Sequence, residues 1–301
     1  MRHLVVITGP TAVGKSHLCE RLALHYHLPV INADSRQIFQ GMRIGTAAPD
    51  EAALSAIKHY FVGTLRPGDY YSAAMFEHDV LALLAKQNAP LSLLSGGSMM
   101  YIDAICNGID EIPTIRDDIR EQLKERLAKE GLPALLGELE RLDPEYYAFV
   151  DRKNARRVVH GLEICMQTGK TYTSFRKQTR KARPFKTVKI GLNRSREELY
   201  DRINRRVDQM MGDGLLDEAR RLYPNRGCNA LNTVGYKELF AHFDGQYTLG
   251  EAVERIKGNT RRYARKQLTW FRRDPEMTWF HPEEETKIID FIDRQCLSSN
   301  Q

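Results

Sequence analysis

The sequence predicts an α/β protein whose core is a parallel β-sheet covered by helices. Two observations support this fold class. Short runs rich in Val, Ile and Leu alternate with helix-like segments through the first hundred residues, and the first run leads into a glycine-rich turn. Strands are expected at 3–8, 28–33, 91–95 and 187–192, and helices at 15–27 and 72–87. Parallel strands need a crossover between them, and a helix usually supplies it.

A region without strand signals interrupts this pattern after Pro113. Amphipathic helical segments at 115–129, 132–142 and 144–150 predict an inserted all-helical subdomain over residues 113–152. The core then consists of a first part, 1–112, and a continuation, 153–301. The continuation is expected to hold helices at 154–166, 196–222, 251–271 and 285–296, with a mobile basic loop at 171–184.

The composition excludes several classes of protein. Of the 301 residues, 42% are hydrophobic and 28% charged, which is enough to bury a large core and excludes a disordered chain. The five cysteines are scattered singly, so neither a disulfide framework nor a thiolate zinc site is indicated. No apolar run approaches the roughly 18 to 20 residues that cross a bilayer, and no signal peptide is recognisable. We expect a cytoplasmic protein with no membrane segment.

The net charge of +6 is unevenly distributed along the chain. Residues 151–210 contain 17 Lys and Arg against 6 Asp and Glu, and residues 255–273 contain eight basic residues and no acidic one. The second block also carries Tyr263, Trp270 and Phe271. Basic runs are often only solvated helix faces. Two of them with interleaved aromatic residues favour a polyanionic partner such as nucleic acid.

The most specific local motif follows the first expected strand. The residues Gly9, Pro10, Thr11, Ala12, Val13, Gly14, Lys15 and Ser16 fit the pattern G-x-x-x-x-G-K-[ST] and open the first expected helix. In this motif the glycines let successive backbone N–H groups face an anion, the lysine adds a positive charge, and the last hydroxyl can bind Mg²⁺. The motif predicts a phosphate-binding loop with Ser16 as the metal ligand.

A phosphate-binding loop does not define the reaction. An ATPase normally adds an apolar strand that ends in Asp to hold Mg²⁺, but the run 91–95 leads into Gly96-Gly97-Ser98. Asp34 instead follows the run 28–33, at the strand end where open parallel sheets bind their ligands. There it could face an acceptor, or it could simply be the N-cap of a helix that follows.

Further segments occur in a familiar order: 34–39 (DSRQIF), 42–47 (MRIGTA), 71–73 (YSA), 96–101 (GGSMMY), 169–171 (GKT), 234–237 (VGYK) and 265–272 (RKQLTWFR). Together with the loop, they make nearly the whole chain resemble the bacterial tRNA dimethylallyltransferases, also called the IPP transferase family. The resemblance implies a P-loop NTPase-like core with a helical insertion. It implies transfer of the dimethylallyl group from dimethylallyl diphosphate to N6 of the adenosine 3′ to the anticodon (position 37), in tRNAs that read codons beginning with U. The products would be N6-isopentenyladenosine and diphosphate.

The resemblance also implies roles for individual residues. The phosphate loop would hold the diphosphate leaving group, which explains a P-loop without the ATPase aspartate. Lys15, Arg206 and Mg²⁺ would stabilise the charge of the leaving group. Asp34 would accept the proton from N6, because an exocyclic amine is a poor nucleophile. Ser98, where the family usually has Thr, would position the adenine, or it could serve as a turn hydroxyl for the Gly96-Gly97 backbone.

The implied partner is the tRNA anticodon stem-loop, with the target base flipped out of the stack, and the protein is expected to act as a monomer. The implied tRNA contacts are Asp34, Ser35, Arg36, Gln37, Ser98, Arg120, Arg156, Arg157, Val158, Val159, His160, Asn232, Thr233, Val234, Gly235, Tyr236, Lys237, Arg265, Lys266, Gln267, Leu268, Thr269, Trp270, Phe271 and Arg272. The chain departs from the family pattern at Phe39, His160, Asn232 and Thr233.

Two other functions remain open from the sequence. A small-molecule kinase would bind ATP in the loop and orient an acceptor hydroxyl with Asp34, but it would have no use for the basic block 255–273. A non-catalytic RNA-binding protein would bind tRNA without turnover.

Overall fold

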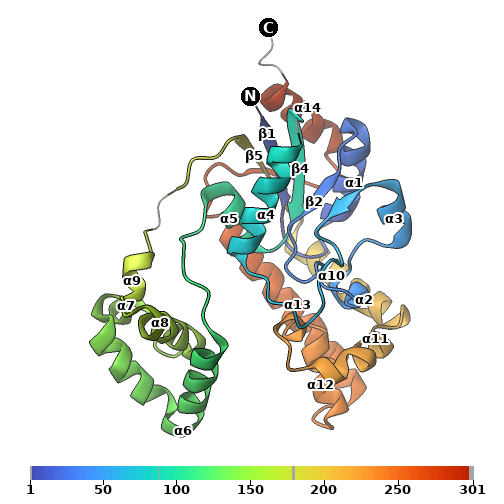
Figure 1. Cartoon of the computed structure of the whole chain (residues 1–301). Coiled ribbons are helices and arrows are strands. Elements are labelled where there is room, and N and C mark those ends of the chain that lie inside the picture. The colour runs from blue at the N-terminus through green and yellow to red at the C-terminus, as the bar shows by residue number, and fades with distance from the viewer. Residues whose placement is uncertain (1, 88, 178–179, 298–301) are drawn as a thin grey trace. The chain divides into compact units, whose positions relative to one another are not determined.

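The computed structural model describes residues 2–87, 89–177 and 180–297, which form two compact units (Figure 1). The core unit comprises Met1–Cys106 and Arg183–Gln301, and the helical unit comprises Asn107–Ala182. The insertion is therefore wider than the expected 113–152. Residues 153–182 belong to it because their helices pack onto the helices before them in one hydrophobic cluster.

The core unit is built on one six-stranded parallel sheet of order β3-β2-β4-β1-β5-β6. The strands are β1 His3–Thr8, β2 Val30–Asn32, β3 His59–Tyr60, β4 Leu91–Gly96, β5 Lys186–Leu192 and β6 Thr278–Phe280. The four expected strands are confirmed. The sequence missed β3 and β6, because these edge strands have only two and three residues and show no apolar alternation.

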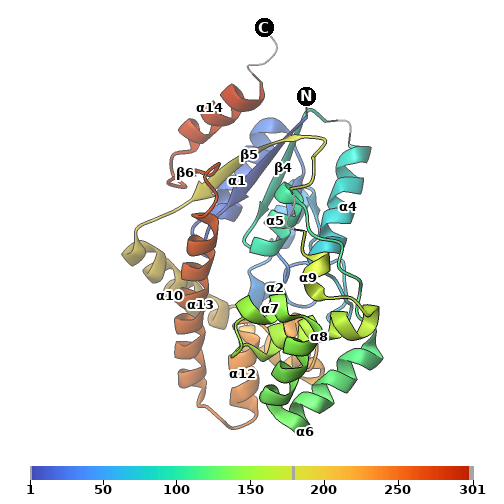
Figure 2. The ribbon, with the colours of Figure 1, turned by 90° about the vertical axis from the view of Figure 1, so that its left-hand side faces the viewer.

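Helices cover both faces of the sheet, so β1 reads as a continuous apolar run rather than an alternating one. Val5 and Ile7 face one cluster, which includes side chains of α1 (Lys15–Tyr26), α10 (Arg196–Gly212) and α14 (Glu285–Cys296). Leu4 and Val6 face the other, formed with α4 (Ala73–Lys86) and α5 (Met99–Asn107). Figure 1 shows β4 and β2 between α4 and α1, and Figure 2 shows the edge strand β6 next to β5. The expected α/β class is confirmed.

Most of the remaining helices of this unit form a third cluster around Tyr236, Leu239 and Leu215. They are α2 Arg43–Thr46, α11 Leu215–Leu222, α12 Tyr236–Phe243 and α13 Leu249–Phe271, with 3₁₀ turns at Tyr223–Asn225 and Asn229–Leu231. The short helix α3 Glu51–Ala56 has no buried residue and lies outside the three clusters. The segment expected as one helix, 196–222, is two helices. Gly214 breaks it because its φ of 97° lies in the left-handed region.

The helical unit consists of α6 Asp117–Leu142, α7 Pro144–Phe149, α8 Ala155–Thr168 and α9 Tyr172–Phe175. Gly131 kinks α6 with a φ of 79°, where the sequence analysis separated two helices. The loop expected to be mobile contains α9, which is fixed to the unit: the Thr173 N–H donates to the buried Asp143 carboxylate at 2.8 Å. Residues 178–179 of that loop lie outside the described residues. No helix in the described ranges is long and apolar enough to span a membrane.

Gly96 offers a test of the sheet geometry next to the site. A Cβ at this position would lie 2.2 Å from the Ala33 carbonyl oxygen, which is backbone and cannot rotate away. We expect Gly96→Ala to lower the free energy of unfolding by about 3 kcal/mol, the upper end for overpacked sites. Gly250→Ala is the matched control, because a Cβ there meets no atom within 4 Å and the change should stay within about 0.5 kcal/mol. Equal denaturation midpoints for the two variants would contradict the close approach.

Candidate active site

The phosphate loop, residues 9–16, connects β1 to α1 at the carboxyl edge of the sheet. Gly9, Ala12 and Gly14 have φ values of 149°, 64° and 114°. Positive φ values of this kind are typical of loops whose backbone N–H groups form an anion-binding concavity. Gly9 must be glycine, because a Cβ would lie 2.6 Å from the Leu192 carbonyl oxygen. The loop ends at the N-terminus of α1, and its role in binding phosphate stays a prediction that this geometry fits.

Gln267 on α13 holds this loop from outside. Its Oε1 accepts a hydrogen bond from the Thr11 N–H at 2.9 Å, and its Nε2 donates to the Gly97 carbonyl at 2.8 Å. Gln267 is 2% exposed, so both ends of its amide are committed inside the protein. The tRNA contact predicted for Gln267 stays a prediction, and the structure adds a brace between the phosphate loop and the end of β4.

Two arginines hold the loop carbonyls on the other side. Arg202 Nε donates to the Ala12 carbonyl and Arg194 Nε to the Val13 carbonyl, each at 2.9 Å. These bonds orient the loop with its carbonyls toward the arginines.

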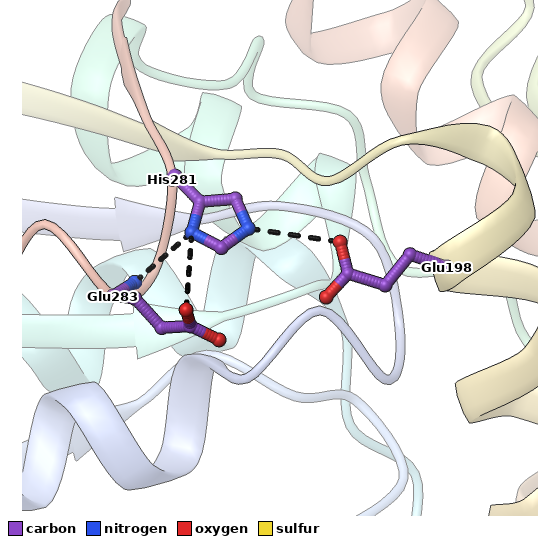
Figure 3. Close-up of side chains that lie close together, drawn as sticks. All are labelled: Glu198, His281 and Glu283. Carbon is purple, nitrogen blue, oxygen red and sulfur yellow. Dashed lines mark hydrogen bonds and ion pairs between the residues drawn. The ribbon is translucent and has the colours of Figure 1, made fainter.

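Arg194 is itself held by the cluster shown in Figure 3. Its Nη1 donates to Glu283 at 3.1 Å, pairs with Glu198 and lies 3.3 Å from His281 Nε2. Within the described ranges, Glu198, His281 and Glu283 form the cluster whose side chains are close enough to hold a metal. The guanidinium already supplies the positive charge among them. The cluster therefore acts as a support for the phosphate loop.

The loop opens into a cleft of about 570 Å³. Its lining carries four basic side chains, Lys15, Arg202, Arg205 and Arg206, and, among the described residues, one acidic side chain, Asp34. This excess of positive charge suits a multivalent anion such as a diphosphate.

Lys15 and Arg206 lie at the phosphate end of the cleft. Lys15 Nζ donates to the carbonyls of Gly9 and Pro10 at 2.9 and 2.8 Å, and Arg206 Nη1 lies 3.4 Å from Thr11 Oγ1. Burial, reinforced by the nearby Arg206 charge, lowers the pKa of Lys15 to about 7. Burial also lowers the pKa of Arg206.

Of the two roles that the sequence left open for Asp34, the structure shows a cap, although on a turn and not on a helix. The role toward an acceptor stays a prediction. Asp34 Oδ1 accepts from the N–H groups of Arg36 and Gln37 at 2.8 and 3.3 Å, which fixes the turn after β2. Its Oδ2 has no hydrogen-bond partner among the described residues, and the side chain lines the cleft. One oxygen therefore holds the carboxylate in place while the other is free to accept a proton.

Ser98 supports the same turn. Its Oγ accepts from the Ser35 N–H at 2.8 Å and lies 3.0 Å from Ser35 Oγ. The side chain is 8% exposed and does not line the cleft. The Ser98 hydroxyl therefore bonds to the turn of residues 34–37, where the sequence analysis offered the Gly96-Gly97 backbone as its partner. Through this turn, Ser98 helps to position Asp34.

A buried carboxylate that the sequence analysis missed shapes the opposite wall. Glu218 accepts from the N–H groups of Ile44 and Gly45 and from the Tyr236 hydroxyl, at 2.8, 2.8 and 2.7 Å. These bonds fix α2, and Gln37 Nε2 donates to the Thr46 and Ala47 carbonyls at its far end. Thr46 and Ala47 line the cleft. Glu218 lies outside any motif, so no local signal identified it.

Helix α13 presents different residues to the core, the cleft and the solvent. Its core side includes Ala264 and Phe271, and both Tyr263 and the buried Gln267 line the cleft. The exposed side carries Arg262, Arg265, Lys266 and Thr269, whose spacing of three and four residues places them on one helical face. The exposed Arg272 and Arg273 directly follow the helix, and we call these six residues together the basic face.

Several residues that the resemblance assigned to tRNA are occupied inside the protein. Tyr236 is fully buried, Phe271 is 2% exposed and Val158 is fully buried, so their side chains cannot meet RNA. Trp270 Nε1 donates to Asp103 at 2.9 Å, and Arg36 Nη1 donates to the carbonyls of Asn229 and Ala230 at 2.8 and 3.1 Å. Leu268 packs partly against the core. Arg265, Lys266, Thr269, Arg272 and Lys237 remain exposed.

The helical unit carries the other assigned contacts, Arg120 on α6 and residues 156–160 on α8. Arg156 and Arg157 are exposed there, whereas His160 lies 3.2 Å from the Glu163 carboxylate.

The sequence analysis missed most of the cleft's side walls. Arg202, Arg205 and Gln209 line the cleft beside Arg206, together with His17, Thr46, Ala47 and Tyr263. The spacing 202, 205, 206 and 209 on one helix was a usable signal, since these positions share a face. Tyr263 and Ala47 could not be identified this way, because tertiary packing alone brings them to the loop.

Gln267→Leu tests the brace. The change leaves the Thr11 N–H and the Gly97 carbonyl without their partner, so we expect the free energy of unfolding to fall by about 2 to 4 kcal/mol. Affinity for inorganic diphosphate should also fall, because the loop N–H loses its orientation. Gln246→Leu, at an exposed position, should change stability by less than about 0.5 kcal/mol. If Gln267→Leu and wild type have equal stability in denaturant titrations, the Gln267 hydrogen bonds do not brace the loop.

The lowered pKa of Lys15 predicts a proton linkage. In the unfolded chain Lys15 has its ordinary pKa of 10.5, so between pH 7 and 10 the folded state binds fewer protons and stability rises with pH. A bound anion restores the proton. At pH 8, wild type should therefore take up nearly one more proton than Lys15→Met when inorganic diphosphate binds, measured by calorimetry in buffers of different ionisation enthalpy. Lys266→Met should match wild type, and equal uptake by all three proteins would contradict the linkage.

Comparison with known proteins agrees with this geometry. Residues 37–274 match the family model described as IPP transferase. The chain is 57% identical over 291 residues to tRNA dimethylallyltransferase 1 of Phocaeicola vulgatus, covering 96% of this chain and 97% of the relative. It is 54% identical over 299 residues to tRNA dimethylallyltransferase 2 of Parabacteroides distasonis, covering 99% and 100%.

Solved structures give the same result. The tRNA isopentenylpyrophosphate transferase of Bacillus halodurans superposes with a TM-score of 0.73 at 36% identity, covering 99% of this chain and 98% of that one. A eukaryotic dimethylallyltransferase acting on tRNA superposes with a TM-score of 0.74 at 25% identity, covering 90% and 70%. With its phosphate loop, cationic cleft and full-length similarity to these proteins, the chain belongs to the IPP transferase family of tRNA dimethylallyltransferases.

Proposed function

We propose that this protein transfers the dimethylallyl group of dimethylallyl diphosphate to N6 of adenosine 37, next to the anticodon, in tRNAs that read codons beginning with U. As a member of its family it is a tRNA-modifying transferase. The observation that carries the detailed proposal is the cleft: four cations surround a phosphate loop, and one carboxylate with a free oxygen faces them.

The phosphate end of the cleft suits the leaving group. As the allylic carbon–oxygen bond breaks, its electron pair goes to the diphosphate. The loop N–H groups, Lys15 and Arg206 are already in place where that charge develops, so little reorganisation is needed. Because the loop holds a leaving group rather than a γ-phosphate, the reaction needs no ATPase aspartate.

Ser16 is the residue that would hold Mg²⁺. Its side chain is exposed, lines the cleft at the start of α1, and has no hydrogen bond among the described residues. A free hydroxyl beside a phosphate loop fits this ion, which takes few protein ligands and completes its shell with phosphate oxygens and water. When bound, Mg²⁺ would neutralise part of the diphosphate charge.

Asp34 acts on the acceptor. The adenine N6 forms the new bond to the allylic carbon, and the proton that N6 loses goes to Asp34 Oδ2. Ser98 contributes by holding the turn that fixes Asp34 Oδ1. We therefore assign Ser98 as a positioning residue and Asp34 as the general base.

The acceptor tRNA is gripped through its phosphates. The basic face of α13 and the exposed Arg156 and Arg157 of the helical unit offer the positive charge that an anticodon stem-loop requires. The target base must leave the stack to reach Asp34. We also propose a monomer as the active form.

The test is single-turnover transfer with an unmodified anticodon stem-loop and radiolabelled dimethylallyl diphosphate, run in parallel with labelled ATP. Wild type should move label to RNA from the prenyl donor alone. Asp34→Asn keeps the turn but removes the base, so its rate should fall by about 10² to 10⁴ while stem-loop affinity persists. Asp50→Asn is the matched control, because Asp50 also accepts a backbone N–H but at an exposed helix cap.

Each opposite outcome points to a different function. Label from ATP in place of the prenyl donor would make the protein a kinase. Stem-loop binding without transfer from either donor would make it a binding protein. If Asp34→Asn transfers at the wild-type rate, Asp34 is not the general base.

A further inference from the structure

The proposed reaction has an electrostatic requirement that the phosphate end of the cleft does not meet. As the carbon–oxygen bond breaks, positive charge develops on the allylic carbon. Lys15, Arg202, Arg205 and Arg206 favour the departing diphosphate but repel this positive charge. The dimethylallyl group therefore needs a wall that is apolar and also tolerates a cation.

The lining offers few candidates for that wall. Among the described residues of the cleft, Tyr263 and His17 carry rings, and the methyl groups come from Thr11, Ala12, Thr46 and Ala47. His17 directly follows the phosphate loop, two residues beyond Lys15. Tyr263 comes instead from α13, outside the loop.

Tyr263 is placed by the brace described above. It lies four residues before Gln267, one helical turn away, and both side chains line the cleft. Since Gln267 is bonded to Thr11 and Gly97, the helix backbone that carries Tyr263 is held beside the phosphate loop.

The surroundings of Tyr263 relate it to the reacting groups. Burial and the nearby Asp34 charge raise its pKa to about 12, so the phenol stays neutral and close to the proposed base. Its hydroxyl has no hydrogen bond among the described residues, and the side chain is 37% exposed. The ring is thus not held by its polar end for a purely structural purpose.

We propose that the ring of Tyr263 is the wall of the dimethylallyl site and that its π face stabilises the positive charge on the allylic carbon during transfer. This inference rests on the proposed function. The bond changes are those given above: the carbon–oxygen pair leaves with the diphosphate, N6 bonds to carbon, and Asp34 takes the proton. Tyr263 exchanges no atoms or electrons; the negative face of its quadrupole faces the cation.

The experiment separates ring electrostatics, packing and the hydroxyl. Tyr263 is replaced by Phe, then by phenylalanines with one, two and three ring fluorines, which keep the shape but progressively weaken the π face. Single-turnover transfer is measured with saturating stem-loop. We expect Tyr263→Phe to stay within about threefold of wild type, and the fluorinated series to fall stepwise by about 10- to 30-fold in all.

Two further measurements test whether a slower transfer rate has another cause, such as a damaged diphosphate site. Tyr263→Leu should be at least as slow as the trifluorinated variant, while inorganic diphosphate binds all variants as it binds wild type. Tyr70→Leu, at an exposed tyrosine outside the cleft, should transfer at the wild-type rate.

A flat fluorinated series would overturn the proposal, whether or not Tyr263→Leu is slow, because packing alone would then explain the ring. A loss in Tyr263→Phe as large as in Tyr263→Leu would also overturn it and assign the role to the hydroxyl. If wild type itself transfers no label, the proposed function fails and this inference fails with it. That outcome is distinct, since it appears before any variant is compared.

Discussion

The site depends on one buried amide, the side chain of Gln267. It bonds the first N–H after the Gly9-Pro10 turn and the carbonyl that follows β4, so it ties the phosphate loop, the sheet and α13 together. An amide can do this because it carries a donor and an acceptor a fixed distance apart. Burial makes both bonds obligatory, since an unpaired backbone group there would cost about 1 to 3 kcal/mol. The helix that carries the basic face thus also fixes the donor site.

Around this brace, basic and acidic side chains lie on different parts of the cleft wall. The cations gather where a leaving group would develop negative charge, and, among the described residues, the one carboxylate that lines the cleft lies on the loop after β2. Gathering the cations has a consequence for Lys15: burial and the Arg206 charge lower the pKa of its amine, so the protonated form is disfavoured. A bound anion would favour the protonated form again. The carboxylates that stabilise the fold, Glu218 and the Glu198–Glu283 pair, are instead committed to N–H groups or to Arg194.

Much of the core could be predicted from the chain. The runs that became β1, β2, β4 and β5 were recognisable because both faces of these strands are buried, which leaves an unbroken apolar signal. The phosphate loop was recognisable because its geometry comes from neighbouring residues. The short edge strands β3 and β6 carry no such signal, and the helical insertion proved longer because the packing of α8 and α9 on α6 and α7 joins distant segments.

The sequence by itself determined the sheet class, the phosphate loop, Asp34 at a strand end and the family. The first three features depend on periodicity and on contacts between residues adjacent in the chain, and the family was recognised from its motifs, which occur in order along the sequence. Only the tertiary structure decided which assigned residues line the cleft and which are buried. Gln267 lies 256 residues from Thr11, and Glu218 lies 173 from Gly45 and also accepts from the Tyr236 hydroxyl. Gln267 and Tyr236 were expected to contact tRNA, and Glu218 was not noticed. Such contacts form when separate helices pack, and no local pattern records which face of a helix meets which loop.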